Sequence, residues 1–469
     1  MNLMNLLDIA LPFLGQTFDV SLNWIGRLIS WLIGGVGIVG VGIILFSLCL
    51  KVIVLPFDIY QRISMRKQNI QMKENKERME KLQKQYANDK EMYNRKLMEM
   101  YKENGISMFS SCLPMILSLV IFIVAINAFN AYSQYANVQN YNLMVDAYNN
   151  KIESYCPDIT AENVAFGTDV ITVKNGESYI YYTVGNTNKY TAYSDEAKTA
   201  IQNATEKTYY VNSAVVSKDE ALMEQIKPLI VENNVEQAMY DYFVDQAQLA
   251  VVDTYNTQVT ENMSFLWIKN IWATDASYKH PVLEYSEFES GAKREEFKIN
   301  GEDVDFSDAI KHTNAYSKDA YDMITEKLAP QKAQANGYYI LIAMSIATIV
   351  VQQLVMMRSQ KEQQKFSSVD GQGASQQKVM LVVMTGMFAI FSFMYSSAFS
   401  IYMITSNVFS LLSTIVINKL VDVHMAKKEA AASEIRNDTR FLSRIEAAKN
   451  AGKNSAKESR EKKSGKNNK

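Results

Sequence analysis

The sequence has few of the residues from which catalytic and metal sites are usually built. Its 469 residues include three histidines, scattered over different segments, and three cysteines, of which only Cys156 falls outside the apolar runs. A disulfide framework is therefore not implied, and no metal-ligand spacing, nucleophile elbow or phosphate loop occurs. The sequence predicts no cofactor, no metal site and no enzyme activity.

Long apolar runs dominate instead, and each is near the roughly 17 to 25 residues that a bilayer helix needs. The last two are separated only by residues 395–397, which predicts a tight hairpin between them. We predict five transmembrane helices, at 34–57, 112–131, 337–357, 379–395 and 398–418.

The net charge of −2 conceals an uneven distribution of charge along the chain. Residues 57–104 carry twelve Lys and Arg against eight Asp and Glu, and residues 419–469 carry fourteen against seven. Residues 132–335 carry sixteen against thirty-one. Because basic segments that flank membrane spans stay in the cytoplasm, we expect a membrane protein with its N-terminus outside and its C-terminus inside.

These patterns predict a polytopic α-helical membrane protein with a cytoplasmic helical hairpin and an α+β extracytoplasmic domain. The N-terminal segment covers residues 1–33 and contains an interfacial amphipathic helix over 18–33. The other segments outside the spans are the hairpin (58–104), the extracytoplasmic domain (132–335), a cytoplasmic loop (358–378) and a basic cytoplasmic tail (419–469). We expect the extracytoplasmic domain to fold on its own.

Local signals set the predicted elements outside the membrane. The hairpin segment lacks proline, and Ala87-Asn88-Asp89 favours a turn between two helices, although a solvated charged linker is the alternative. Asn175-Gly176 predicts a β-hairpin. Ser217 to Glu220 matches a capping box before a helical stretch that Pro228 interrupts. The acidic group over 302–308 is typical of a solvated face rather than of a calcium loop.

Lys51 is the most informative single residue, because it lies deep inside the first apolar run. A lone cation there costs roughly 2.5 to 3.5 kcal/mol, so it usually faces water, a partner or a functional cavity. The alternative is that its side chain snorkels to the interface, but the polar edge at Asp58 is roughly 10 Å away along a helix.

Several stretches together resemble the YidC-type (oxidase-assembly) membrane protein insertases. The stretches that carry the resemblance are Leu50 to Pro56, Leu97 to Ile106, Ser111 to Pro114, Ser264 to Ile271 and Ile401 to Asn407. The resemblance implies an insertase and chaperone for nascent membrane proteins in the bacterial plasma membrane. Insertases of this family usually have an arginine in a hydrophilic groove. The matching position here is Lys51, which keeps the charge but lacks the planar guanidinium group.

Other positions also depart from the family pattern. Ser107-Met108 stands where Asn-Pro is common, and Met384-Thr385 stands where Met-Pro is common. The external connection before the third span, normally short, is interrupted at about 133–262 and again at about 278–335. We therefore expect a large extracytoplasmic insertion between the second and third spans.

On this interpretation a hydrophilic intramembrane groove contains Lys51 and further polar residues. The expected neighbours are Ser118 and Asn127 on the second span, Gln352 and Gln353 on the third, and Ser406 and Asn407 on the fifth. The implied partners are nascent membrane proteins, the lipid bilayer, a Sec translocon, a ribosome bound through the tail and hairpin, and an unknown partner of the extracytoplasmic domain. Two alternatives stay open: a transporter or channel in which Lys51 binds an anionic solute, and a membrane anchor for an extracytoplasmic binding or quality-control module.

Overall fold

The computed structural model describes residues 8–12, 14–103, 109–155, 169–175, 178–184, 206–212, 216–217, 219–359, 373–424 and 426–427. The chain divides into two compact units, which are described separately. The first comprises Met1–Lys51, Leu117–Gln353 and Val379–Asn407, and the second comprises Val52–Ile116, Leu354–Lys378 and Val408–Lys469.

The segment expected to form an amphipathic helix and the first span contains two helices, with the break a few residues later than expected. Helix α1 covers Trp24–Val36, and helix α2 covers Val39–Glu74. The chain breaks at Gly37, whose φ of 73° suits a residue without a Cβ. The amphipathic helix expected from residue 18 begins only at Trp24, because the Asn23 side chain accepts a hydrogen bond from the Gly26 amide at 2.7 Å and caps it there.

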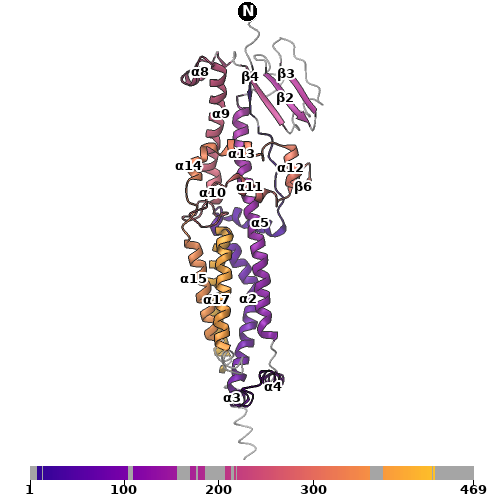
Figure 1. The fold of residues 1–469 in the computed structure, drawn as a ribbon, viewed down its shortest axis with the longest axis vertical. Helices are drawn as coiled ribbons and strands as arrows, with labels where there is room; N and C mark the ends of the chain where they lie inside the picture. The colour runs from indigo at the N-terminus through magenta and orange to yellow at the C-terminus, as the bar shows by residue number, and fades with distance from the viewer. Residues whose placement is uncertain are drawn as a thin grey trace, which may run out of the picture. The chain divides into compact units, whose positions relative to one another are not determined.

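Helix α5 is much longer than the predicted second span. It covers Phe109–Glu153, and at about 1.5 Å per residue its 45 residues reach roughly 68 Å, about twice the hydrocarbon thickness of a bilayer. Figure 1 shows α5 running on from beside α2 into the layer that contains α9, α11 and α13. One continuous helix therefore connects the apolar helices with the layer that contains α9, α11 and α13.

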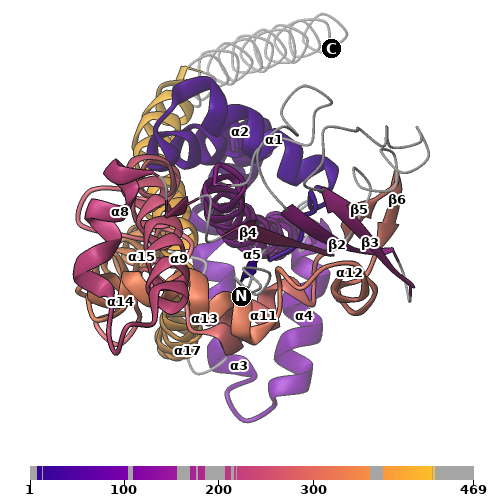
Figure 2. The ribbon, with the colours of Figure 1, turned by 90° about the horizontal axis from the view of Figure 1, so that it is seen from above.

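Tyrosine side chains form much of the core around the distal half of α5. Figure 2 shows α9 (Val235–Thr254), α11 (Tyr285–Ala292) and α13 (Lys318–Thr325) around α5. The buried Tyr141 ring lies 4.6 Å from that of Phe288 and 5.1 Å from that of Tyr321, measured between centroids. The Tyr141 hydroxyl donates to the Ala315 carbonyl at 2.6 Å, so its burial leaves no polar group unpaired.

The N-terminal segment is part of this same core. Asn149 of α5 accepts from the Leu14 amide at 3.1 Å and donates to the Gly15 carbonyl at 2.7 Å. Two helical turns earlier, Asn142 donates to the Phe18 carbonyl at 2.9 Å. The residues before α1 and the part of α5 from Leu117 onward therefore belong to the first compact unit.

Two sheets and several short helices complete this part of the chain. The order of the four-stranded antiparallel sheet is β1-β4-β2-β3, and β5 pairs with β6. The predicted β-hairpin is confirmed, since Asn175 pairs with Ser178 at its turn. The strands are β1 (Asp8–Leu11), β2 (Asp169–Asn175), β3 (Ser178–Val184), β4 (Glu206–Asn212), β5 (Phe297–Ile299) and β6 (Glu302–Val304).

The predicted helix after residue 217 begins at α8 (Glu220–Ile226), and its cap is Asp219 rather than Ser217. The Asp219 carboxylate accepts from the Leu222 amide at 3.0 Å. The interruption at Pro228 is confirmed, because it lies in a 3₁₀ turn, Lys227–Leu229, before α9. After α9 the chain continues through a π-helical turn (Tyr255–Val259) and α10 (Thr260–Met263).

The acidic residues over 302–308 cap and pair with their neighbours. Asp305 caps α12 (Phe306–His312), and hydrogen bonds from the Ser307 hydroxyl and the Asp308 amide lower its pKa. Asp308 pairs with Lys311 at 2.6 Å, and Asp303 accepts from the Ser21 hydroxyl. Within the part of the chain that the structure describes, no group of three or more His, Cys, Asp or Glu is placed to hold a metal ion.

Three further apolar helices follow. They are α15 (Ile340–Ser359), α17 (Gly373–Met394) and a last helix, Ser397–His424. A 3₁₀ turn (Glu326–Leu328) and the short α14 (Ala329–Lys332) precede α15. The tight connection expected at 395–397 lies between the last two. Among the described residues, Val39–Tyr60 and Ser397–His424 are long and apolar enough to cross a bilayer, and Trp24–Val36, Ile340–Val355 and Thr385–Met394 are shorter apolar stretches.

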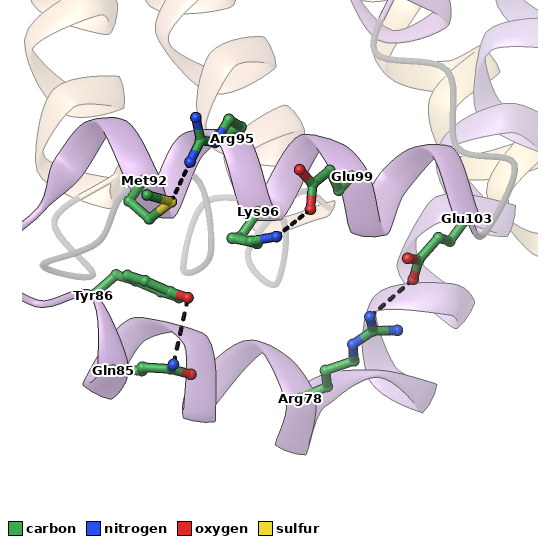
Figure 3. Close-up of polar contacts among 8 residues, drawn as sticks. All are labelled: Arg78, Gln85, Tyr86, Met92, Arg95, Lys96, Glu99 and Glu103. Atoms are coloured by element: carbon green, nitrogen blue, oxygen red, sulfur yellow. Dashed lines mark hydrogen bonds and ion pairs between the residues drawn. The ribbon is translucent and has the colours of Figure 1, made fainter.

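In the second unit, α3 (Lys76–Gln85) and α4 (Lys90–Glu103) form an antiparallel pair around the predicted turn at 87–89. Met79, Tyr93, Leu97 and Met100 form its small buried core, and burial raises the pKa of Tyr93. Figure 3 shows the exposed face, where Arg78 pairs with Glu103 at 2.9 Å and Lys96 with Glu99 at 2.7 Å. Most of the loop expected at 358–378 and of the tail beyond 427 lies outside the described residues.

Candidate functional site

Lys51 lies at the edge of the packed face of α2. Buried residues recur at helical spacing along this face, from Val39 through Ile43 and Phe46 to Val54. Phe46 makes an edge-to-face contact with Phe129 of α5, at 5.4 Å between ring centroids. Lys51 is half-buried, one turn after the fully buried Ser47, whereas Val52 and Ile53 are exposed. The Lys51 side chain thus leaves α2 at the border between its packed face and its exposed face.

Of the polar residues expected on the third and fifth spans, Asn407 contacts α15, but its partner there is Thr348, which the sequence did not single out. The Asn407 amide donates to the Thr348 hydroxyl of α15 at 3.2 Å, and Asn407 and Ser406 are both buried. Gln352 follows Thr348 by one helical turn, and Gln352 and Gln353 are half-buried. This face of α15 therefore carries two half-buried polar residues, Thr348 and Gln352, one turn apart.

A second polar contact joins α15 to α17, and sequence reasoning missed it. The buried hydroxyls of Ser345 and Ser392 lie 3.1 Å apart, and each also lies within hydrogen-bond distance of a carbonyl in the preceding turn of its own helix. Because each hydroxyl has a single hydrogen, one of the two donates to its carbonyl and accepts from the other. Serine and threonine are common in membrane helices because they let backbones approach closely. Their spacing alone gives no signal that distinguishes such helix-linking pairs from residues lining a groove.

The two candidates on α5 have a different setting. Asn127 is exposed and follows Val120, Ile123 and Val124 at helical spacing on an exposed stripe. It therefore points away from the packed face that contains Phe129. Ser118 lies within α5, but its side chain is outside the described residues.

Residues 264–277, which we call the strap, connect several apolar helices at one end. The strap backbone accepts from the first amides of the last helix: Ser397 donates to the Ala273 carbonyl at 2.8 Å and Ala398 to the Ile271 carbonyl at 2.9 Å. The Thr274 hydroxyl donates to the Tyr395 carbonyl at 3.0 Å. Helix-terminal groups that have no partner in their own helix are thereby satisfied by the strap.

The strap also caps α15 through a buried carboxylate. Asp275 is fully buried and accepts from the Tyr338 amide at 2.7 Å and the Leu341 amide at 2.6 Å. A Cβ on Gly337 would lie 1.9 Å from the Asp275 Oδ1 atom, so glycine is required there. A carboxylate at this position also interacts favourably with the positive end of the helix dipole.

A pair of buried asparagines closes the base of the second interruption. Asn336 accepts from the Asn270 amide at 2.6 Å, and its side chain donates to the carbonyls of Asn270 and Thr274, both at 2.9 Å. Asp275 and Tyr338 are therefore neighbours in space although 62 residues separate them in the sequence. The second interruption, about 278–335, begins and ends beside the strap.

These features define a mostly helical membrane protein in which apolar helices are linked by polar contacts and joined to further helices and two small sheets. Residues 31–216 and 187–426 match the model of a family described as 60Kd inner membrane protein. The chain therefore belongs to this family, which is that of the YidC-type proteins indicated by the sequence motifs.

Curated relatives share shorter stretches with the chain. It is 38% identical over 98 residues to "Membrane protein insertase YidC" of Caldanaerobacter subterraneus subsp. tengcongensis, which is 21% of this chain and 46% of that protein. Proteins of the same name match from Fusobacterium nucleatum, at 38% over 86 residues (18% and 40%), and from Francisella philomiragia, at 36% over 124 residues (25% and 22%). Each match spans less than half of the relative's length.

Proposed function

We propose that the protein is an insertase that moves segments of nascent membrane proteins into the bilayer and assists their folding. The family assignment supports this function, and the observation that carries it is the position of Lys51, half-buried at the edge of the packed face of an apolar helix. A cation in this setting is retained against a cost of roughly 2.5 to 3.5 kcal/mol, which favours a functional role.

The proposed topology has five transmembrane helices formed by parts of α2, α5, α15, α17 and the last helix. The basic hairpin α3–α4 and the tail would lie in the cytoplasm, and the N-terminus and residues 132–335 outside. The extramembrane region is then an insertion in the family's short external connection. The strap, whose motif resembles that connection, supports this view because it still joins the helix ends directly.

In the proposed mechanism, Lys51 attracts an acidic segment of the substrate into a hydrophilic groove. At about 4 Å and an effective dielectric constant near 20, opposite charges interact by roughly 4 kcal/mol, which offsets part of the cost of leaving water. The adjoining apolar segment of the substrate then passes into lipid. A negative charge moved outward would also gain roughly 2.3 kcal/mol per 100 mV from an inside-negative membrane potential, which supplies energy without a nucleotide.

The polar neighbours have different proposed roles. Gln352 and Gln353, half-buried on α15, are suited to hydrate the groove. Asn407 is engaged with Thr348 and would mainly fix the distance between α15 and the last helix, with Ser406 buried beside it. Asn127, on an exposed stripe, would contribute only if substrate or water reaches that face of α5.

The wider set of proposed partners comprises nascent membrane proteins, a Sec translocon, and ribosomes that contact the hairpin and the tail. Exposed lysines and arginines of α3–α4 suit an anionic surface, although several are already paired with glutamates. This pairing makes the tail the stronger candidate for ribosome contact, because it carries fourteen basic against seven acidic residues.

Replacing Lys51 tests the function. In cells depleted of their resident insertase, we expect Lys51→Arg to insert a single-span reporter with an acidic external tail at nearly the native rate. Lys51→Glu and Lys51→Leu should lower insertion by about tenfold or more, equivalent to about 1.4 kcal/mol or more. The double variant Lys51→Leu, Val52→Lys is a matched control, because it moves the cation to an exposed position on α2 and should not restore insertion. Normal insertion by every variant would show that Lys51 is a snorkelling residue.

A further inference from the structure

The strap begins with a tight turn that presents an apolar side chain. Phe265 and Ile268 exchange backbone hydrogen bonds at 2.9 and 3.0 Å, which leaves Leu266 and Trp267 at the tip. Leu266 has a φ of 55°, and its side chain is 71% exposed.

Leu266 combines two unfavourable features that protein packing does not offset. Left-handed backbone geometry favours glycine or asparagine over leucine, and an exposed leucine gains no burial energy within the chain. Strained residues persist where surroundings or function require them. The combination points to a contact that this side chain makes with something other than the described protein.

The packing of the preceding residue fixes where this tip lies along α2. A Cβ on Gly40 would lie 2.1 Å from Cγ of Phe265, so the Phe265 ring occupies the space that this glycine leaves. Gly40 is the second residue of α2, whose apolar span begins at Val39. The Leu266 turn therefore lies beside the first turn of a membrane-length helix.

Helix α1 lies at the same end and presents two exposed tryptophans. Gly42 of α2 allows the Ile33 backbone to approach, since a Cβ there would lie 2.7 Å from the Ile33 Cα. Trp24 and Trp31 of α1 are 73% and 71% exposed. Tryptophans concentrate at membrane–water interfaces, and apolar side chains on short surface segments bind there by entering the acyl boundary.

We propose that the Leu266 turn is a lipid-docking surface that inserts into the leaflet at the Val39 end of α2, with Trp24 and Trp31 beside it. The docked turn then sets the depth of Lys51 in the bilayer. Lys51 follows Gly40 by eleven residues, or about 16 Å along the helix, roughly half of the 30 Å hydrocarbon thickness. Anchoring Gly40 at the interface would hold Lys51 near the bilayer centre. This inference depends on α2 spanning the bilayer and not on insertase activity.

Spin-label accessibility in the full chain tests the lipid contact. Cys49, Cys112 and Cys156 are replaced by serine, a nitroxide is attached at Leu266→Cys, and the protein is reconstituted in vesicles of phosphatidylethanolamine and phosphatidylglycerol. We expect the label to collide several-fold more with oxygen, and several-fold less with a water-soluble nickel chelate, than a label at Val231→Cys. Val231 is the matched control because its side chain is 70% exposed and lies between α8 and α9.

Two results would overturn the proposal. Equal nickel accessibility at 266 and 231 would place the tip in water, and low accessibility to both reagents would show that protein covers it. Leu266→Asn separates docking from folding, because asparagine tolerates the left-handed turn. This variant should keep the native yield and protease resistance in detergent while quenching of tryptophan fluorescence by brominated lipids falls. Unchanged quenching would contradict the proposal.

Discussion

At the scale of single residues, the buried carboxylate of Asp275 connects the strap to α15. It receives two backbone hydrogen bonds at the start of that helix and is fully buried. A hydrogen bond to a charged group contributes about 1.5 to 3 kcal/mol, and removal of the acceptor also leaves two buried amides unsatisfied.

We therefore expect Asp275→Ala to destabilise the protein by about 3 kcal/mol or more, and Asp275→Asn by less, because its carbonyl oxygen still accepts one bond. Thermal inactivation of the purified protein in detergent, followed by protease resistance, measures the loss. Asp308→Ala is the control, since Asp308 is exposed and should change stability by only about 0.5 kcal/mol. Equal effects of the Asp275 and Asp308 variants would contradict a capping role.

Glu295 predicts a pH dependence of stability in the region around α11. Burial, and secondarily the neighbouring Glu296, raises the pKa of Glu295 from its ordinary 4.5 to about 7. The folded state thus binds this proton more tightly than the unfolded chain. Its contribution to stability is fully present below about pH 4.5 and is lost as the pH rises through about 7.

From about 1.4 kcal/mol per pKa unit, the expected loss between pH 4.5 and 8 is on the order of 1 to 3 kcal/mol. Glu295→Gln should remove this slope and be the more stable form at pH 8. Hydrogen exchange of the α11 amides across this pH range measures the effect. Glu296→Gln removes the charge of an exposed neighbour and should only reduce the change of stability with pH. An unchanged pH dependence in Glu295→Gln would assign the effect to another group.

The sequence identifies Lys51 but not Asp275, and the reason is physical. A charge inside an apolar run is visible because the bilayer makes it costly wherever the helix lies. Asp275 lies in a polar connection, where an aspartate has no distinctive surroundings in the sequence. Its role depends on the Tyr338 and Leu341 amides, more than 60 residues away, which only the fold brings to it.

At the scale of elements, local chemistry determines what the sequence can predict. The turns at 87–89, 175–178 and 395–396 lie where turn residues and apolar periodicity place them. The helix break at Gly37 and the cap at Asp219 differ from the prediction by a few residues, because competing caps lie close together in the sequence.

Nonlocal contacts explain the larger differences. Nothing in the α5 sequence ends the helix at 131, since Tyr132 to Glu153 has no proline or glycine and packs Tyr141, Val145 and Tyr148 into a core. The attachment of residues 14–18 depends on Asn142 and Asn149, which are seven residues apart and so lie two turns apart on one face of α5. Asparagines in a helix are ordinarily read as solvent-facing, so periodicity alone gives no sign of this contact.

At the scale of the whole molecule, the contacts of the strap bear on two hypotheses about which part of the chain performs the function. If the membrane core performs insertion, the extramembrane region is a module added at positions that the strap already holds together. If the module is the functional part, the helices serve mainly to anchor it. The contacts among Asn270, Asn336 and Asp275 favour the first hypothesis, because they join the helix ends without the module.

A chain that lacks residues 278–334 and 136–260, each replaced by a flexible linker of about ten residues, tests this difference. Such a linker spans roughly 17 Å on average, and the segments to be joined lie near the strap, where the Tyr132 and Trp272 ring centroids are 5.0 Å apart. We expect the shortened chain to insert the acidic-tailed reporter within a few-fold of the native rate, and Lys51→Leu to abolish that activity in the same background. A milder variant that removes only residues 157–205 controls for misfolding, because it keeps α5, the helices around it and the β1–β4 pairing. Loss of insertion in both shortened chains, with protease resistance of the membrane helices retained, would place the function in the extramembrane module instead.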